Sequence, residues 1–600
     1  MDFLFSMQNS DANAEMSDSV CRERILSENT YDYITDFPLS GFLGFEESLC
    51  YADVDGMYYI LYLDPSVALN SPVGAFQYQS IPKLYGLMQV SSSDNAFNPD
   101  ALIVSGILQA QRPPLRLTGR GCVICFIDTG IDYTMDVFRD ADGNSRVLAI
   151  WDQTIQSGTP PEGFLYGSEY TREDINRALR SENPYNIVPS RDENGHGSIL
   201  AALAAGSATD GSNRYLGAAP DADIVVVKLK ECKNYLRDYY LIPRDVPAYQ
   251  ENDIMLAVKY ADSFARVLSR PVIICLALGT NMGDHAGNSA LSRYINDVAV
   301  RRSRAVVVCS GNEGNASHHY RGRLPQTGST DGIGTGPVGA GGIPDNNVEV
   351  RVGDNCSGFT LECWSSLPDT LQVGLRSPGG EVVPPQRSNG GQSVTYRLVY
   401  ENTIITLDST LVEPSSGEQL LRFRLQNPTP GIWTFQVNSP GTVYNGTFDI
   451  WLPITEFLDS EVYFLRPDPY ITLTEPSMAP DVITVTSYNP ANLSFSINSS
   501  RGFSRTGSIR PDLAAPGENI FTIEGYESGS SLAAAITAGA LAQLFQWAVI
   551  QWRSPFAESR ELKSYLIRGA ARSSFLAYPN REWGYGRLDV AGTFDALIGM

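Results

Sequence analysis

Short apolar runs alternate with amphipathic or small-residue segments along much of the chain. Four runs rich in Val, Ile and Leu predict buried strands: "GCVICFIDTG" (121–130), "ADIVVVKLK" (222–230), "PVIICLALG" (271–279) and "RAVVVCSGN" (304–312). Three segments between them predict helices: "GHGSILAALAAG" (195–206), "ENDIMLAVKYADSFARVLS" (251–269) and "SALSRYINDVAVRRS" (289–303). This alternation predicts an α/β fold whose parallel sheet is covered by helices on both faces.

The pattern changes near residue 345. From there to about 455, apolar and polar positions alternate between turn signals, as in "VEVRV", "FTLECW" and "GIWTFQV", which predicts a jelly-roll-like β-sandwich. The α/β character returns from "PDVITVTSYN" (480–489), so the sandwich is predicted to be inserted into one α/β domain. The predicted domains are an N-terminal region (1–90), a first α/β part (91–343), the sandwich (344–455) and a second α/β part (456–600).

Two segments without a regular pattern are interpreted as linkers. The glycine-rich "GSTDGIGTGPVGAGGIPDNN" (328–347) contains Pro337 and lacks the lysine of a phosphate-binding loop. The polar "QVSSSDNAFNPDA" (89–101) is predicted to be exposed and open to cleavage.

Composition narrows the function more than the fold. The 600 residues are 43% hydrophobic and 18% charged, as in folded globular proteins. The formal net charge of −23 argues against a nucleic-acid partner, because phosphate contacts need clustered Lys and Arg. The first residues carry no basic region followed by an apolar core, and no apolar stretch was long enough to predict a membrane span. We therefore expect neither a secretory signal nor a membrane span, with export by another route left open.

The nine cysteines do not follow a disulfide framework. Cys122 and Cys125 are an odd number of positions apart, so their side chains point to opposite faces of a strand. We interpret them as buried apolar residues rather than a redox or metal pair. Only Cys356 and Cys363 are placed for a bridge, within a hairpin. The pattern predicts no obligatory disulfide.

Four side chains carry candidate chemistry, and each has an ordinary explanation when taken alone. Asp128 and Asn312 end two predicted strands, where turn formers are common, although functional residues also gather at the carboxyl ends of parallel strands. His196 lies between two glycines at a predicted helix start. Ser531 lies in "GYESGSSLAAAITAGA" (525–540), where a serine can simply cap the helix. The other three histidines lie in loops without helical metal-ligand spacing, which makes His196 the natural general base.

In combination, these segments resemble the subtilisin-like serine peptidases, the subtilases of family S8. The matching motifs occur in the family's order: "DTGID" (128–132), "NGHGS" (194–198) for the usual NGHGT, and "GSS" (529–531) for the usual GTS. "PDLAAPGENI" (511–520) and "REWGYGRLDV" (581–590) resemble the segment before the serine and the closing segment. The resemblance covers roughly residues 85–343 and 456–600 and implies a subtilisin-like parallel sheet flanked by helices.

The resemblance implies a triad that hydrolyses peptide bonds through an acyl-enzyme. Ser531 aligns with the nucleophile, in preference to Ser528 and Ser530. His196 would take its proton, Asp128 would orient the imidazole, and Asn312 would donate to the developing oxyanion beside the backbone N–H of Ser531. "ALGTN" (277–281) resembles the family's substrate-binding strand.

Four further residues follow from that alignment as substrate-binding positions. Leu278 and Gly279 would form one wall of the pocket for the residue before the cut, and Ser310 and Gly311 would help to form another. Backbone pairing to this strand would direct the site to extended peptides.

Some positions depart from the family's usual residues. Ser198 replaces a threonine, Ile199 stands where His is usual, and Ile536 replaces a noncatalytic histidine. The segments "GSSLAAAITAG" (529–539), "YPNREWGYGRLD" (578–589) and "RVLAIWDQTI" (146–155), together with the sandwich insertion, resemble clostridial-type subtilases such as the Csp spore-germination proteases. This resemblance implies a protein of the bacterial cytoplasm or spore. That group implies that residues 1–90 are a prodomain, an intramolecular chaperone or inhibitor, which self-cleavage near residues 87–93 would separate.

The expected function is a serine endopeptidase that acts on its own prodomain and on peptide or protein substrates, with no metal or cofactor. A structural calcium is not readable from the sequence. One alternative is a catalytically silent subtilase-fold binding or sensor protein, a pseudoprotease. Another is a structural protein in which the sandwich binds a ligand, although we interpret the sandwich as stabilising. The complete set of Asp128, His196, Ser531 and Asn312 favours the enzyme.

Overall fold

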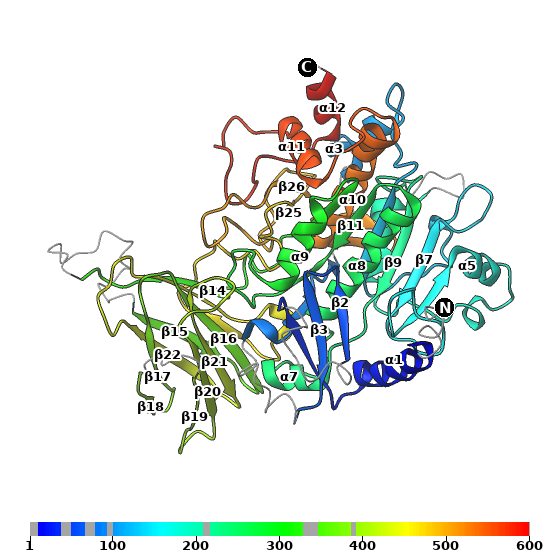
Figure 1. The fold of residues 1–600 in the computed structure, drawn as a ribbon. Coiled ribbons are helices and arrows are strands. Elements are labelled where there is room, and N and C mark those ends of the chain that lie inside the picture. Colours follow the sequence, from blue (N-terminus) through cyan, green and yellow to red (C-terminus); the bar gives the residue numbers. More distant parts are fainter. Residues whose placement is uncertain are drawn as a thin grey trace, which may run out of the picture.

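Three parts of the chain pack together in the computed structural model (Figure 1), which describes residues 10–37, 50–65, 78–92, 100–207, 216–327, 346–385 and 392–598. The largest part is an α/β unit, and a β-sandwich lies at one side of it. A small N-terminal sheet and a helix lie against the α/β unit. Most of the glycine-rich linker (328–345) and residues 93–99 of the polar linker lie outside the described residues.

The α/β unit is built on an eight-stranded sheet, as the sequence predicts. Its strands, in spatial order, are β26 (Leu513–Pro516), β25 (Ile483–Tyr488), β13 (Arg304–Cys309), β11 (Val272–Leu276), β6 (Val123–Asp128), β9 (Asp223–Lys228), β7 (Val147–Asp152) and β8 (Ser168–Thr171). All neighbouring pairs are parallel except β7 and β8, which are antiparallel at one edge. The carboxyl ends of β6 and β13 therefore meet at one edge of the sheet.

Helices cover both faces of this sheet and form two separate apolar cores. On one face lie α6 (His196–Ala205) and α10 (Ser530–Phe545), and on the other lie α8 (Glu251–Leu268) and α9 (Ala290–Ala299). Side chains of β6 alternate between the two cores: Phe126 packs on the first and Cys125 on the second. Cys122 and Cys125 are buried free thiols on opposite faces, as predicted.

Shorter elements complete the α/β unit. They are η3 (Tyr78–Ser80), β4 (Leu84–Leu87), β5 (Ser91–Ser92), α3 (Ala101–Val104), α4 (Ile107–Gln111), η4 (Asp136–Phe138), α5 (Arg172–Leu179), η5 (Pro184–Asn186), α7 (Asn234–Tyr240), β10 (Tyr249–Gln250), β12 (Leu278–Gly279), β27 (Ile520–Thr522), β28 (Gly525–Ser528), η7 (Gln546–Ile550), α11 (Ser559–Gly569) and α12 (Val590–Ile598).

One helical stretch is more apolar than the sequence-based expectation allowed. Ser530–Ile550 is long and apolar enough, by length and composition, to cross a membrane, with a mean hydropathy of 1.5 over an 18-residue window. Yet 83% of that window is buried inside the protein, where the small side chains of α10 pack closely against α6 and the sheet. A central core helix has the same composition as a membrane span, and here the protein itself supplies the apolar surroundings.

The inserted region is a two-sheet sandwich. One sheet has the order β14 (His319–Arg323), β23 (Thr447–Trp451), β16 (Gly358–Ser365), β21 (Gln419–Gln426), β20 (Ile404–Thr410) and β19 (Gln392–Arg397). The other has the order β18 (Val382–Val383), β17 (Gln372–Arg376), β22 (Gly431–Asn438), β15 (Asn347–Val352) and β24 (Val462–Phe464). The outlying strands β14 and β24 fall outside the predicted interval 344–455 but pair with these sheets.

A short turn between two strands of the sandwich, β23 and β24, contacts the α/β unit. This turn, η6 (Thr455–Phe457), follows β23 and packs against β4. Trp451 at the end of β23 is stacked between His285 of the α/β unit (4.0 Å between ring centroids) and His319 of the sandwich (4.7 Å). Burial lowers the pKa of His285 to about 3, so its ring is neutral in this stack. The sandwich and the α/β unit therefore share a packed interface.

In the described residues of the N-terminal region, a helix lies against a three-stranded antiparallel sheet. The helix is α1 (Ser10–Leu26), and the strands are β1 (Tyr31–Thr35), β2 (Cys50–Val54) and β3 (Tyr58–Leu63), in the order β1-β3-β2. A disulfide joins Cys21 of α1 to Cys50 of β2, so the prediction of a chain without an obligatory disulfide missed this pair. The two residues are 29 positions apart and meet only because α1 packs on the sheet. Cys356 and Cys363 are free.

A buried polar contact ties the N-terminal region to the α/β unit. Lys233 donates to the Asp32 carboxylate (2.7 Å) and to the Thr30 carbonyl oxygen (3.1 Å), and both charged side chains are at most 3% exposed. The other oxygen of Asp32 accepts hydrogen bonds from the amides of Gln250 (2.7 Å) and Asn252 (3.2 Å). The charges are thus paired and their hydrogen bonds satisfied, which is the condition for burying them.

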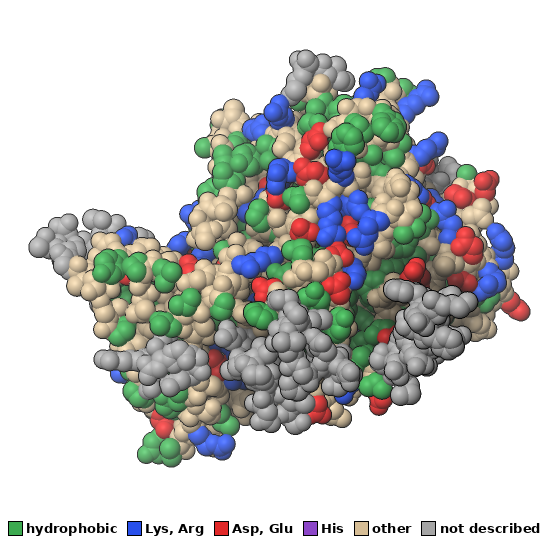
Figure 2. Space-filling model, in the orientation of Figure 1, with side chains coloured by type: hydrophobic (Ala, Val, Ile, Leu, Met, Phe, Trp, Pro, Cys, Tyr) green, Lys and Arg blue, Asp and Glu red, His purple; other side chains and the backbone are tan. Residues whose placement is uncertain are grey.

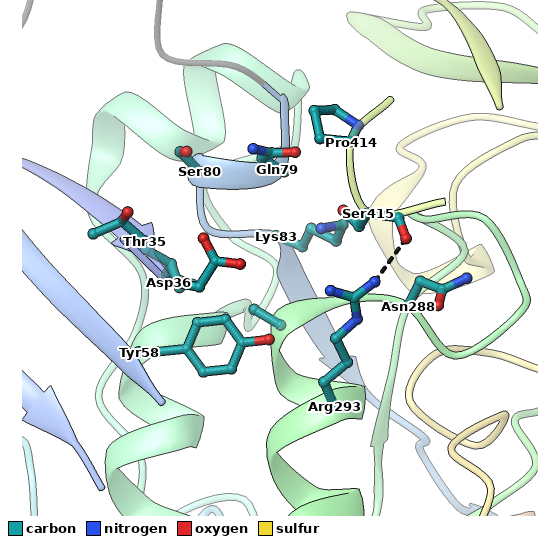
Figure 3. A pocket seen from close by; sticks show the side chains of 12 residues that line it. Thr35, Asp36, Tyr58, Gln79, Ser80, Lys83, Asn288, Arg293, Pro414 and Ser415 are labelled. Atoms are coloured by element: carbon teal, nitrogen blue, oxygen red, sulfur yellow. Dashed lines mark hydrogen bonds between the residues drawn. The ribbon is translucent and has the colours of Figure 1, made fainter. Parts of the chain in front are cut away.

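The three parts also meet around a cavity of about 170 Å³ (Figure 3). Tyr58 comes from the N-terminal sheet, Lys83 from the segment after it, Arg293 from α9 and Ser415 from the sandwich. Arg293 donates to the Ser415 carbonyl oxygen at 2.6 Å, so its guanidinium bridges two of the parts.

The face of the molecule shown in Figure 2 carries charges of both signs. On the face shown in Figure 2, Lys and Arg side chains are interspersed with Asp and Glu over the described residues. This mixture of charges is typical of a solubilising surface.

We predict that Lys233→Met lowers the free energy of unfolding by about 3–5 kcal/mol, because it leaves the Asp32 carboxylate buried without its cation. Urea unfolding followed by circular dichroism measures the change. The matched control is Arg120→Ala, which breaks an ion pair with Asp221 whose side chains are 78% and 41% exposed. We expect that control to change the free energy by only about 0–1 kcal/mol. Equal unfolding midpoints for the two variants would contradict the prediction.

Candidate active site

The sheet brings a carboxylate and an imidazole together at its carboxyl edge. Asp128 is the last residue of β6 and His196 is the first residue of α6. His196 Nδ1 lies 2.8 Å from Asp128 Oδ1, and the side chains are 3% and 1% exposed. Asp128 Oδ1 also accepts from the Thr129 backbone N–H at 2.8 Å, which holds the carboxylate in place.

The two glycines around His196 have different physical roles. Gly195 has φ +86°, a left-handed conformation that side chains disfavour, and it turns the chain into α6. Gly197 lies so close to the loop after β6 that a Cβ would come within 2.2 Å of the Gly130 carbonyl oxygen. The "NGHG" motif therefore permits the close approach that brings His196 to Asp128.

The pKa of His196 is raised above its ordinary value of 6.5. Burial acts in the opposite direction, because it disfavours the imidazolium. The Asp128 carboxylate outweighs this effect through its charge and its hydrogen bond, and Asp192 and the Met88 carbonyl add to it. The site thus stabilises a protonated His196.

Ser531 lies at the start of α10, on the same edge of the sheet. Its hydroxyl is buried, and Oγ makes no hydrogen bond within the described part of the chain. Asn312, just beyond β13, accepts from the Ser530 backbone N–H through Oδ1 at 3.0 Å. This bond orients the amide of Asn312 so that its Nδ2 group faces the site.

A strand of the same chain runs through the site. Leu84–Leu87 (β4) lies between β10 and β12 and pairs antiparallel with both, with Tyr85 opposite Tyr249 and Gly86 opposite Gly279. The Met88 N–H donates to the Ala277 carbonyl oxygen at 3.1 Å. Further along, Ser91–Ser92 (β5) pairs with β28. Residues 84–92 are therefore held on both sides of the candidate catalytic groups.

The carbonyl groups of Met88 and Gln89 face His196 and Asn312, respectively. Asn312 Nδ2 donates to the Gln89 carbonyl oxygen at 3.0 Å, and His196 Nε2 lies 3.3 Å from the Met88 carbonyl oxygen. A Cβ on Gly529 would lie 3.2 Å from the Gln89 oxygen and 3.3 Å from Ser531 Oγ, so those two atoms border the same small space. The Gln89 carbonyl thus accepts a hydrogen bond from Asn312 and borders the same small space as the Ser531 hydroxyl.

The predicted substrate-binding residues divide into two groups. Leu278 and Gly279 form β12 and pair with β4, which we call the bound strand. Ser310 and Gly311 lie next to Thr474: Ser310 accepts from its backbone N–H at 3.0 Å, and a Cβ on Gly311 would approach its side chain within 2.6 Å. The sequence analysis missed Thr474 and β10. A two-residue strand such as β10 carries no periodic signal that could have predicted it.

Metal ligation has no evident place in this site. Among the residues that the structure describes, no group of three or more His, Cys, Asp and Glu side chains could hold a metal ion. His285, His318 and His319 are each engaged elsewhere: His318 bonds Glu313 at 2.6 Å, His319 bonds Asp449 at 3.1 Å, and His285 bonds the Leu473 carbonyl oxygen at 2.9 Å.

Comparison with known proteins follows the same boundaries. The model of the subtilase family, peptidases S8, matches residues 119–335 and 470–586, which is more than half of the chain and leaves out the sandwich. The solved structure of the Clostridium perfringens CspB protease is 31% identical, with a TM-score of 0.71, over 83% of this chain and 99% of that chain. Serine protease AprX of Bacillus subtilis (strain 168) is 24% identical over 289 residues, 46% of this chain.

The match to AprX spans about half (52%) of that protein's length. The match to the CspB protease spans almost all of that chain and includes more than the family model covers. With the family model, the fold and the Asp–His–Ser order in agreement, the chain belongs to the subtilase family.

Proposed function

We propose that this protein is a serine endopeptidase that cuts its own chain between Gln89 and Val90. The observation that carries the proposal is the hydrogen bond from Asn312 Nδ2 to the Gln89 carbonyl oxygen, at 3.0 Å, in a strand bound across the site. A donor at this distance is what an oxyanion hole supplies to the carbonyl under attack. Membership of the subtilase family and the likeness to the CspB protease support the same reaction class.

The neighbouring Met88–Gln89 bond is the less favourable choice. Its carbonyl oxygen faces His196 Nε2 rather than the Asn312 amide. A neutral imidazole with its proton on Nδ1 presents a lone pair at Nε2 and cannot stabilise an oxyanion there. The Gln89 carbonyl accepts from the Asn312 amide and borders the same space as Ser531 Oγ. Attack at Gln89 would therefore form the oxyanion next to a hydrogen-bond donor.

The reaction then follows from the chain's own residues. His196 turns from the Met88 carbonyl to Ser531 and takes the hydroxyl proton as Oγ bonds to the Gln89 carbonyl carbon. Asn312 stabilises the resulting oxyanion, and Asp128 stabilises the imidazolium. His196 passes the proton to the nitrogen of Val90 as the Gln89–Val90 bond breaks. Water, deprotonated by His196, hydrolyses the acyl-enzyme and leaves a carboxylate on Gln89.

By this proposal, residues 1–89 are the prodomain. Its buried ion pair, Asp32 with Lys233, and the pairing of β4 with β10 and β12 support a role in folding the α/β unit and in covering the cleft. Other peptide or protein substrates would bind in the same extended form after β4 leaves the cleft.

We expect intact-mass spectrometry of the purified protein to find fragments that end at Gln89 and begin at Val90. Ser531→Ala removes the nucleophile and should stay whole. The matched control, Ser530→Ala, removes the adjacent buried hydroxyl and should still be cut. A fragment beginning at Gln89 would instead assign the cut to the Met88–Gln89 bond. A wild-type chain that is folded yet stays whole would favour the noncatalytic binding protein.

We also predict that self-cleavage slows in acid with a midpoint above pH 6.5, because His196 must be neutral to take the proton and its pKa is raised. Precursor diluted from denaturant into buffers of about pH 5 to 8 would be followed by mass spectrometry. Asp128→Asn removes the main group that raises this pKa, so the midpoint should move to lower pH while the rate falls by about 10⁴-fold. A wild-type midpoint below that of the variant would contradict the assignment of the base.

A further inference from the structure

One residue of the bound strand is a glycine for reasons of space alone. Gly86 precedes Gln89 by three positions and pairs with Gly279. Its backbone conformation is one that any residue adopts. A Cβ on Gly86, however, would lie 2.5 Å from Ile454 Cδ1 and 3.2 Å from Phe457 Cε1. The first distance is far inside van der Waals contact, so a side chain requires that wall to move.

The two side chains that form this wall are buried in a packed core. Ile454 is fully buried and Phe457 is 1% exposed, and both belong to the core that includes Leu84 of the bound strand and the adjacent Met88. Because protein interiors are close-packed, an added methyl group forces neighbouring side chains into strained positions. The subsite for residue 86 is therefore closed by buried apolar atoms.

Hydrogen bonds hold the wall to the loop after β13 that contains Asn312. The Thr455 backbone N–H and hydroxyl both donate to Glu313 Oε1, at 3.0 and 2.9 Å. Glu313 follows Asn312 directly, and its other oxygen bonds His318 at 2.6 Å. On the other side, Asn281 donates to the Leu452 carbonyl oxygen at 3.1 Å. The turn between β23 and β24 is thereby fixed to both segments that line the cleft.

We infer that Ile454 and Phe457 determine specificity by closing one subsite, so that the enzyme accepts extended peptides with glycine three residues before the residue whose carbonyl is attacked. The inference rests on the proposed function for its catalytic readout. The wall lies between the sandwich strands β23 and β24, so the inserted domain contributes to substrate selection. One added methyl group in a tight apolar subsite changes a rate by about 10- to 200-fold.

The test compares Gly86→Ala with the wild type in two backgrounds, using the full chain refolded from denaturant. In the natural background, we expect Gly86→Ala to slow the Gln89–Val90 cut by at least about 10-fold. Ile454→Val deletes Cδ1, the atom that a Cβ on Gly86 would strike. In that background the ratio between the two rates should shrink towards one. Gly441→Ala is the control, because a Cβ there meets nothing within 4 Å, and it should leave the rate unchanged.

A second measurement does not need catalysis. In the Ser531→Ala chain, an added protease of broad specificity reports whether residues 84–92 stay seated. We expect Gly86→Ala to speed the added protease's cut in this segment and Ile454→Val to restore protection. If the segment stays protected and the cleavage ratio stays near one, the inference is overturned. If the wild type is never cut but protection follows this pattern, the proposed function fails while the closed subsite stands.

Discussion

The antiparallel pairing of residues 84–87 between β10 and β12 is the constraint on which the rest of the site depends. Ladder hydrogen bonds fix the backbone of the bound strand, so they determine which carbonyl meets the Asn312 amide. A slip of one residue would reverse every side chain in the cleft and bring a side chain to the wall that Gly86 now faces. Register and side-chain selection are thus set by the same contacts.

The sheet and half of the site were predictable from local sequence. Apolar runs identified the parallel strands, and the carboxyl ends of parallel strands meet, so Asp128 and Asn312 could be expected at one edge. Ser531 was distinguished from its neighbours only through the resemblance to a family. The Cys21–Cys50 bridge, the outlying strands of the sandwich and the bound strand depend on pairings between distant segments. Such pairings leave no trace in local periodicity.

Electrostatics and packing act together at the cleft. Burial alone would keep His196 neutral, and the adjacent Asp128 carboxylate reverses that preference. The Glu313 carboxylate joins the loop after β13 to the turn between β23 and β24. The stack of Trp451 between His285 and His319 binds the same two parts further along. The inserted domain is therefore a fixed wall of the enzyme rather than a tethered appendage.

The position of the sandwich, inserted between β13 and β25, also has a consequence for the order of synthesis. Asp128 and His196 leave the ribosome early, whereas Ser531 follows about 400 residues after Asp128. At typical translation rates of about 5–20 residues per second, the nascent chain spends tens of seconds without its nucleophile. During that interval the N-terminal sheet can fold and β4 can pair with β12. Both steps can precede the synthesis of Ser531, the proposed nucleophile.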